Sequence, residues 1–399
     1  MLRIIIILFA LMSYAQSQNL ETIISHALST HNSLKAIEQR LKVVDDSIEL
    51  TQHFTNPTLS LSVGDIQLDD LTNRSIEPMQ FTSLTFQQKI PYFGKRAANA
   101  SLAKAQKDVV YGSLEEAKVA LVKEIKLTAY TIWEVKQKLQ VVDKKIDLIK
   151  QSIELHTIYS SSGDSAMMDI TTSKLRFLEF KIAKSKIKST FDSLLKRLSY
   201  LSNQDITSVE SHVDPKEPKT FDEYFSELQN NQSYKKELVK IKEKNSLVKV
   251  RDLASKIDPF VSVGYFYREA FADYVNITVG ASLPIYGSES IESEQARKEV
   301  LQAQLQSSDL YEKLSSDLAV SYSNLQSSYE IYQIIATQSI PEIDHMLELS
   351  STMLKNGKNL ILFLNMQENK LSLEEKKYMA MASYKRYEAQ IQALVGETK

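Results

Sequence analysis

A strand-like run that stops at a proline and leads into a very long stretch without helix breakers occurs twice in this chain. The first copy is LTFQQKIPYFGKR at residues 84–96, and the second is VGASLPIYGSES at residues 279–290. In each copy a glycine follows the proline three residues later. Pro91 and Pro284 are 193 residues apart (284 − 91), close to half of the 399 residues. We therefore expect a duplicated unit in which short strands are continued by long helices.

The stretch after Gly94 predicts one very long helix. As far as Tyr159 it contains no proline and one interior glycine, Gly112, and strong helix formers dominate it. A helix of this length would measure about 100 Å, which is typical of a coiled coil or a helical array rather than of a globular domain. The corresponding stretch 288–353 differs in carrying Pro341, which should kink the helix.

Each long helix is predicted to reverse at a turn that contains glycine. Gly163 marks the first turn and Gly357 the second, and antiparallel helices should follow over 168–201 and 359–395. Helices are also expected ahead of the strands, over 19–54 and 221–257. The predicted organisation is a signal peptide at 1–15, a first repeat at 16–203, a linker at 204–218 and a second repeat at 219–399, the two repeats forming one intertwined unit.

Four segments alternate between apolar and small or polar residues, as strands with one apolar face do: 58–64, 81–90, 260–267 and 274–283. No predicted helix is apolar enough to cover such a sheet. In an outer-membrane barrel the apolar face meets lipid and the polar face meets water, and strands of about ten residues span the bilayer. Four strands cannot close a barrel, so the chain must oligomerise, and three copies would supply twelve. The alternatives are a small sheet packed on helices in a soluble protein, or a coiled-coil protein with a coincidental strand pair.

The first residues predict export. Arg3, the apolar run 4–12 and the small residues Ser13 and Ala15 have the order of a secretory signal peptide. The chain has no cysteine and a formal charge of −2, which excludes disulfides and thiolate chemistry and gives no basic surface for nucleic acid. The six histidines are scattered, and no catalytic motif stands out. We therefore predict a protein that is not an enzyme and has no cofactor, catalytic residue or metal site.

In the order of these features the chain resembles the TolC-like outer-membrane factor family. The resemblance rests on the strand after Asn56-Pro57, the motif Gln88-Lys-Ile-Pro91-Tyr-Phe-Gly94-Lys95-Arg96, the turn at Gly163, and the second copy through Pro284 and Gly357. It implies a homotrimer with a twelve-stranded barrel in the Gram-negative outer membrane and a periplasmic α-barrel. It also implies docking on a periplasmic adaptor and an inner-membrane pump, with loops 65–80 and 268–273 facing outside.

The same resemblance assigns the turns at Gly163 and Gly357, with Lys358, to the closed periplasmic tip that meets the adaptor. Family members often carry aspartates shortly after the second turn, but this chain has Phe363 and Met366 there, which suggests an apolar constriction. Asp164 and Asp169 near the first turn could supply charge, although solvated helix-end aspartates are the simpler interpretation.

Two further expectations concern the strand-to-helix junctions and the substrate. Pro91, Gly94, Pro284 and Gly287 are interpreted as structural hinges between the two barrels, with the glycines allowing close packing there. The form of the first junction most resembles the branch that serves heavy-metal pumps of the resistance-nodulation-division type. A drug-efflux or type I protein-secretion duct is the alternative within the fold, and an exported coiled-coil or adhesin-like protein is the alternative outside it.

Overall fold

The computed structural model describes residues 18–159, 164–354 and 360–397. The predicted signal peptide lies outside this part of the chain. The described elements are mostly helices, with one four-stranded sheet and one short two-stranded pairing. This confirms the predicted fold class of long helices with a small β part.

By mutual contacts the chain divides into two units, and each contains segments from both halves of the sequence. One unit comprises residues 36–114 and 233–311, and the other comprises residues 1–35, 115–232 and 312–399. The two long helices α4 (Lys95–Tyr159) and α8 (Ser288–Ile334) contribute to both units.

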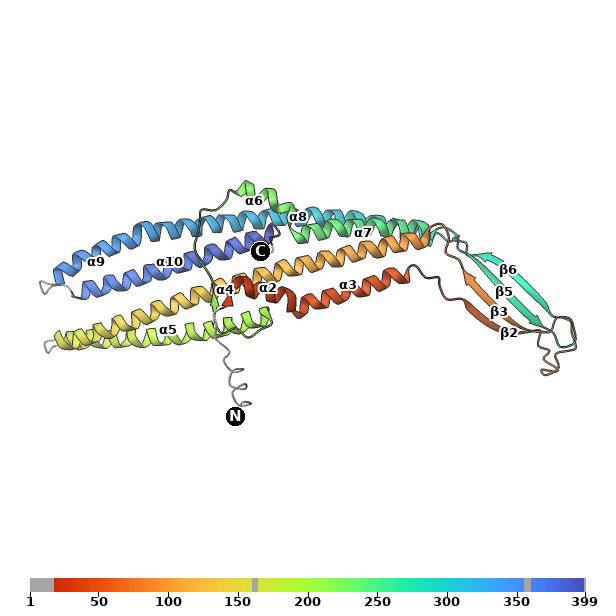
Figure 1. Ribbon diagram of the computed structural model, residues 1–399, viewed down its shortest axis with the longest axis horizontal. Coiled ribbons are helices and arrows are strands. Elements are labelled where there is room, and N and C mark those ends of the chain that lie inside the picture. Colours follow the sequence, from red (N-terminus) through yellow and green to blue (C-terminus); the bar gives the residue numbers. More distant parts are fainter. Residues whose placement is uncertain (1–17, 160–163, 355–359, 398–399) are drawn as a thin grey trace, which may run out of the picture. The chain divides into compact units, whose positions relative to one another are not determined.

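The first unit contains the four-stranded sheet, in which β2 (Thr58–Gly64), β3 (Phe81–Lys89), β5 (Pro259–Tyr267) and β6 (Tyr274–Ala281) pair antiparallel in the order β2-β3-β5-β6 (Figure 1). The central pairing joins strands from the two halves, with Thr85 opposite Gly264. The helices of this unit are most of α3 (Asn32–Leu50), α7 (Gln232–Ala254) and the first parts of α4 and α8. Small buried side chains such as Ala103, Ala296 and Ala303 allow these helices to approach closely.

The second unit contains the remaining helices. These are α2 (Leu20–Thr30), α5 (Asp164–Ser202), α6 (Phe221–Glu227), the 3₁₀ turn η1 (Leu228–Asn230), the π-helical turn η2 (Ile335–Ser339), α9 (Ile340–Leu354) and α10 (Leu360–Leu394). Its core includes Ile125, Ala129 and Ile132 of α4, which recur four and three residues apart and so form an apolar stripe, together with Leu198 and Ile391. The stripe therefore faces neighbouring helices.

Two polar groups of α4 are also largely buried in this unit. Lys126 donates to Oε1 of Gln392 at 2.7 Å, and burial lowers the pKa of its ammonium group. Burial and the nearby Glu388 carboxylate raise the pKa of Tyr130 to about 12. Loss of hydration disfavours the charged form of each group, which is the ammonium of Lys126 and the phenolate of Tyr130.

Two predicted helices are interrupted. The expected helix 19–54 is broken at His31, which is extended (φ −63°, ψ 126°), nearly buried, and lies edge-on to the Tyr200 ring. The expected helix 221–257 is broken after η1, where Asn231 donates from Nδ2 to the backbone carbonyl of Leu394 at 2.9 Å. In both cases a tertiary contact outweighs local helix propensity.

The remaining departures are local. Within the predicted linker 204–218, β4 (Val209–Glu210) pairs in parallel with β1 (Gln18–Asn19). At Pro341 the irregularity takes the form of η2, which places a π-turn immediately before the proline. Proline cannot donate the N–H that a regular helix would use, and a π-turn is one way to accommodate the resulting gap. None of the helices in the described ranges is both long and apolar enough to cross a bilayer.

Candidate functional site

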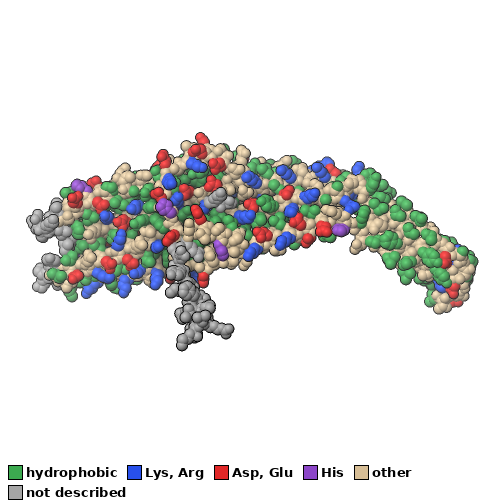
Figure 2. Space-filling view, viewed as in Figure 1, with side chains coloured by type: hydrophobic (Ala, Val, Ile, Leu, Met, Phe, Trp, Pro, Cys, Tyr) green, Lys and Arg blue, Asp and Glu red, His purple; other side chains and the backbone are tan. Residues whose placement is uncertain are grey.

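The four-stranded sheet exposes its apolar face. The register aligns Leu61 with Leu84, Leu84 with Tyr265, and Tyr265 with Val275, so one apolar row crosses all four strands. Leu61, Ile277 and Val279 are 70–73% exposed, and Figure 2 shows hydrophobic side chains gathered over the sheet while charged side chains are spread over the helices. An exposed apolar band of this extent is typical of a surface that meets lipid or protein.

The opposite face is lined by small and polar side chains: Ser60, Ser62, Ser83, Thr85, Ser262, Asn276 and Thr278. The strands β2 and β6 each pair on one side only within the described residues. Their outer edges therefore present unpaired backbone N–H and C=O groups, which favour pairing with a further strand.

The first strand-to-helix junction ends the ladder at Pro91. The Ile90 N–H still donates to the Pro259 carbonyl at 2.9 Å, and Pro91 then has no N–H to offer. Gly94 has φ +79° and Gly287 has φ +76°, in the left-handed region that suits glycine. No atom lies within 4 Å of where a Cβ would sit at either glycine. The expectation that these glycines provide close packing is therefore wrong in the single chain, because backbone conformation is what requires them.

The cations after Gly94 tie helix α4 to neighbouring helix ends. Lys95 pairs with Asp258 at 2.9 Å and donates to the Lys256 carbonyl at 2.6 Å. The Arg96 guanidinium lies 4.3 Å from the centre of the Phe54 ring and donates to the backbone beyond α3. The pairing of Lys95 with Asp258 joins segments that are 163 residues apart (258 − 95).

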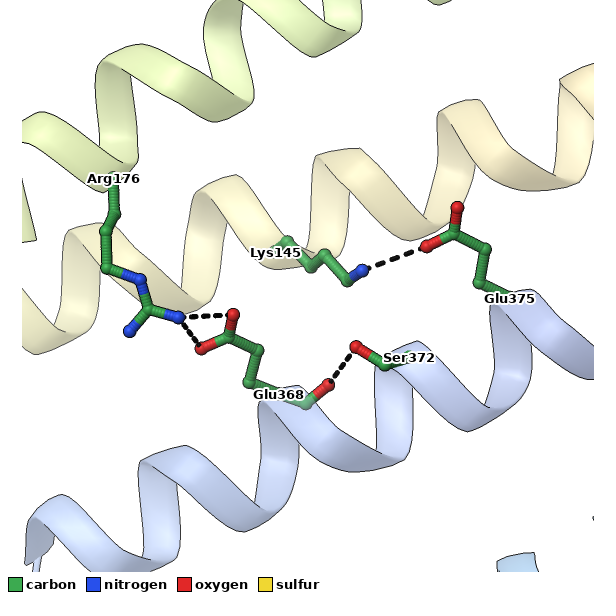
Figure 3. A network of polar contacts seen from close by, with 5 residues as sticks. All are labelled: Lys145, Arg176, Glu368, Ser372 and Glu375. Atoms are coloured by element: carbon green, nitrogen blue, oxygen red, sulfur yellow. Dashed lines mark hydrogen bonds and ion pairs between the residues drawn. The ribbon is translucent and has the colours of Figure 1, made fainter.

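Three helices of the second unit are joined by a polar network near the predicted tip (Figure 3). One guanidinium nitrogen of Arg176 on α5 lies 2.5 Å from both carboxylate oxygens of Glu368 on α10. Lys145 on α4 donates to Glu375 on α10 at 2.9 Å, and the Ser372 hydroxyl donates to the Glu368 carbonyl at 3.0 Å. The side chains are only partly exposed, so these pairs are less screened than fully solvated ones.

Within each helix pair, further ion pairs connect neighbours. Lys184 of α5 lies 2.6 Å from Asp143 of α4, and Lys370 of α10 lies 2.5 Å from Asp344 of α9. The Arg176–Glu368 and Lys145–Glu375 pairs differ because they connect the α4/α5 pair with the α9/α10 pair. A separation of the two hairpins would break them, together with the Lys144–Glu374 and Arg386–Glu134 pairs that also join α4 to α10.

Comparison with known proteins identifies the family. Residues 23–199 match the model described as outer membrane efflux protein. Over these residues the chain is similar to this family. Efflux proteins of this kind are TolC-like outer-membrane channels of tripartite systems, with the strands in the outer membrane and the helices in the periplasm, as the sequence predicted. The members are channels, which agrees with the prediction that the protein is not an enzyme.

Solved channels share the fold. The open-state MtrE channel of Neisseria gonorrhoeae has a TM-score of 0.77 and 12% identity over 95% of this chain and 89% of its own. VceC of Vibrio cholerae has a TM-score of 0.75 and 14% identity over 95% and 96%. CusC has a TM-score of 0.76 and 11% identity over 96% and 93%. No curated protein matches the sequence significantly.

The predicted tip of the efflux protein is only partly described. Gly163, Gly357 and Lys358 lie outside the described residues. Asp164 and Asp169 lie on the first turns of α5, and their side chains are likewise outside what the structure describes. Phe363 and Met366 are half-buried on the first turns of α10. The apolar constriction and the adaptor contact stay predictions.

The sequence patterns do not predict the Arg176–Glu368 network. Both residues read as ordinary charges on helices that are already rich in charge, and 192 residues separate them. The repeat offers a hint, since this spacing nearly equals the offset of 194 between Gly163 and Gly357 (357 − 163). Residues one repeat apart are candidates for contact when two copies of a hairpin pack side by side.

Proposed function

We propose that three copies of this chain form the exit duct of a tripartite efflux system, and that the duct passes substrates without chemistry of its own. The observation that carries the proposal is the four-stranded sheet with an exposed apolar face and two unpaired edges. Pairing β6 of one copy with β2 of the next would satisfy both edges, and three copies would close a barrel of twelve strands with its apolar face toward lipid.

The proposed partners are suggested by the similarity to a family that serves tripartite systems. A periplasmic adaptor would contact the tip formed by the turns at Gly163 and Gly357, together with Asp164, Asp169 and Lys358. An inner-membrane pump of the resistance-nodulation-division type would supply the energy. The duct itself needs no cofactor, because transport through an open tunnel requires only a path and a gradient maintained by the pump.

The gate would lie at the periplasmic end of the helices. Phe363 and Met366, half-buried on α10, would line an apolar constriction in place of acidic side chains. The Arg176–Glu368 and Lys145–Glu375 pairs would hold the two helical hairpins of each copy together in the closed state. A tunnel closed in this way can open when an adaptor or pump replaces these pairs with contacts of its own.

Heavy-metal cations are the proposed substrates. The support is the form of the first junction, Gln88-Lys-Ile-Pro91-Tyr-Phe-Gly94-Lys95-Arg96, which resembles the heavy-metal branch of the family. Met167 and Met168 on α5 are both 73% exposed. Exposed thioethers are soft ligands, which suits transient contact with soft metal ions.

A deletion strain tests the function and the substrate together. We expect loss of the gene to raise susceptibility to zinc, cadmium or copper, and the plasmid-borne gene to restore resistance. Raised susceptibility to dyes and antibiotics alone would support the drug-efflux alternative, and impaired export of a protein would support the secretion alternative. Unchanged susceptibility and unchanged secretion would contradict the efflux function and favour the structural or adhesin-like alternative.

A further inference from the structure

The polar face of the sheet also carries four aromatic rings. The register places Phe81 directly opposite Gly64, Phe260 opposite Gly280, and Phe266 opposite both Ser83 and Tyr274. These positions alternate with the apolar row on the other face, so the rings share a face with Ser60, Ser62 and Thr278. Four large rings on a face of small residues require an explanation.

Three of the rings lie over the three glycines of the strands. A Cβ built on Gly64 would lie 2.3 Å from the Phe81 ring, and one on Gly280 would lie 2.4 Å from the Phe260 ring. A Cβ on Gly264 would lie 2.7 Å from Thr85 Oγ1 and 2.9 Å from the Phe266 ring. Each ring therefore occupies the space that a side chain at the glycine would fill, and the ring lies against the sheet.

Backbone conformation does not explain these glycines. The glycines with positive φ in the described part of the chain are Gly94, Gly287 and Gly396. Gly64, Gly264 and Gly280 adopt ordinary strand conformations that any residue can reach. What glycine provides at these three positions is the absence of a side chain beneath a ring.

At the loop end of the sheet the flattened rings support one another. Phe81 meets Phe266 edge-on with ring centres 5.0 Å apart, and Phe266 stacks on Tyr274 at 4.7 Å with 9° between the planes. The Arg268 guanidinium lies 5.1 Å from the centre of the Tyr274 ring and donates to the Pro78 carbonyl of the other loop at 3.1 Å. Phe81, Phe266 and Tyr274 therefore form a continuous layer on this face of the sheet, and Arg268 contacts that layer at the loop end.

We propose that Gly64, Gly264 and Gly280 set the bore of the channel and thereby the size of solute that can leave it. This inference rests on the proposed function, in which the polar face of the sheet lines the lumen of a trimeric barrel. Three copies would place twelve aromatic rings around the lumen, and the glycines keep nine of them flat against the wall. A side chain at any of these positions would push the overlying ring away from the sheet and into the lumen.

Single-channel conductance of the full-length protein, purified from the outer membrane and inserted in planar bilayers, tests the proposal. All channels carry Arg176→Glu to hold the proposed tip open, because a closed tip would limit the current whatever the bore of the barrel. Gly64→Ala and Gly280→Ala should each lower the conductance, whereas Phe81→Ala should raise it, by about 1.2- to 2-fold, because current scales with the open cross-section of a pore. The double variant Gly64→Ala with Phe81→Ala should not show the lower conductance of Gly64→Ala. Leu61→Ala, on the lipid side of the same strand, is the matched control and should conduct like the wild type.

The outcomes separate this inference from the proposed function. If the wild-type protein forms no trimer and no channel, the proposed function itself is wrong. If the wild type conducts and the Gly64→Ala and Phe81→Ala channels conduct equally well, the glycines do not set the bore. Should Gly64→Ala fail to assemble, Phe81→Ala decides alone, since it only removes atoms, and an unchanged conductance would overturn the inference.

Discussion

At the scale of single residues, the glycines of this efflux protein serve two different physical needs. Gly94 and Gly287 have positive φ and open space around the Cβ position, whereas the strand glycines have ordinary φ and a ring in that space. A larger side chain is unfavourable at both kinds of site, but for different reasons. At the junctions the cost is backbone strain, and in the sheet it is a steric clash.

The junction glycines can be tested by a conformational argument. Gly94→Ala should lower the stability of the folded protein by about 1–2 kcal/mol, the cost of forcing an L-residue into the left-handed region. Gly94→Asn should cost less, because asparagine tolerates that region better. Denaturant titration of the detergent-solubilised protein measures both. An alanine variant as stable as the wild type would contradict this account.

At the scale of elements, the long helices are held together by two kinds of contact. Small and aliphatic side chains form the seams, and ion pairs at the tip connect the α4/α5 pair with the α9/α10 pair. Apolar seams resist separation under all salt conditions, whereas partly exposed ion pairs weaken as salt rises. The ion-paired ends of these helices are therefore the part best suited to separate without loss of the fold.

Charge reversal tests the proposed latch. Arg176→Glu places two carboxylates side by side, and we expect it to raise the permeability of the outer membrane to a large antibiotic. Adding Glu368→Arg restores an opposite-charge pair and should restore closure. Lys150→Glu, in an exposed pair with Asp147 on the same helix, is the control and should have no effect. If the single and double variants leak equally, or neither leaks, the pair does not hold the gate.

At the scale of the whole molecule, one chain leaves its main apolar surface uncovered. The exposed row on the sheet and the open edges of β2 and β6 belong to the same element. Covering the row with lipid and the edges with neighbouring copies satisfies both at once. Folding, membrane insertion and oligomerisation should therefore depend on the same strands.

Two substitutions on adjacent residues of β6 separate the two faces. Ile277→Asp puts a charge on the proposed lipid face and should abolish the SDS-resistant, heat-labile trimer, because a carboxylate in hydrocarbon is unfavourable. Thr278→Asp puts the same charge on the lumen face and should leave the trimer intact. Gel mobility with and without heating measures both. A soluble monomer in the wild type, or normal assembly of Ile277→Asp, would contradict the barrel.

Much of the fold follows from local sequence patterns. Alternation locates all four strands to within a few residues and assigns their faces, and the absence of breakers after Gly94 predicts α4, Lys95–Tyr159, closely. Period and breakers act over a few residues, so they can be read without knowing the neighbours. The interruptions at His31 and Asn231 could not be read in this way, because the contacts that favour them come from Tyr200 and Leu394.

The candidate sites depend more on contacts between distant segments than the fold does. The two prolines, the two junction glycines and the apolar faces are visible as soon as the repeat is noticed, because each acts on its own backbone. The tether from Lys95 to Asp258, the Arg176–Glu368 pair and the contact of the Phe81 ring with the Phe266 ring exist only because the β3–β5 pairing and the packing of two hairpins bring distant segments together. Contacts between side chains more than a hundred residues apart leave no local period, so packing alone establishes them.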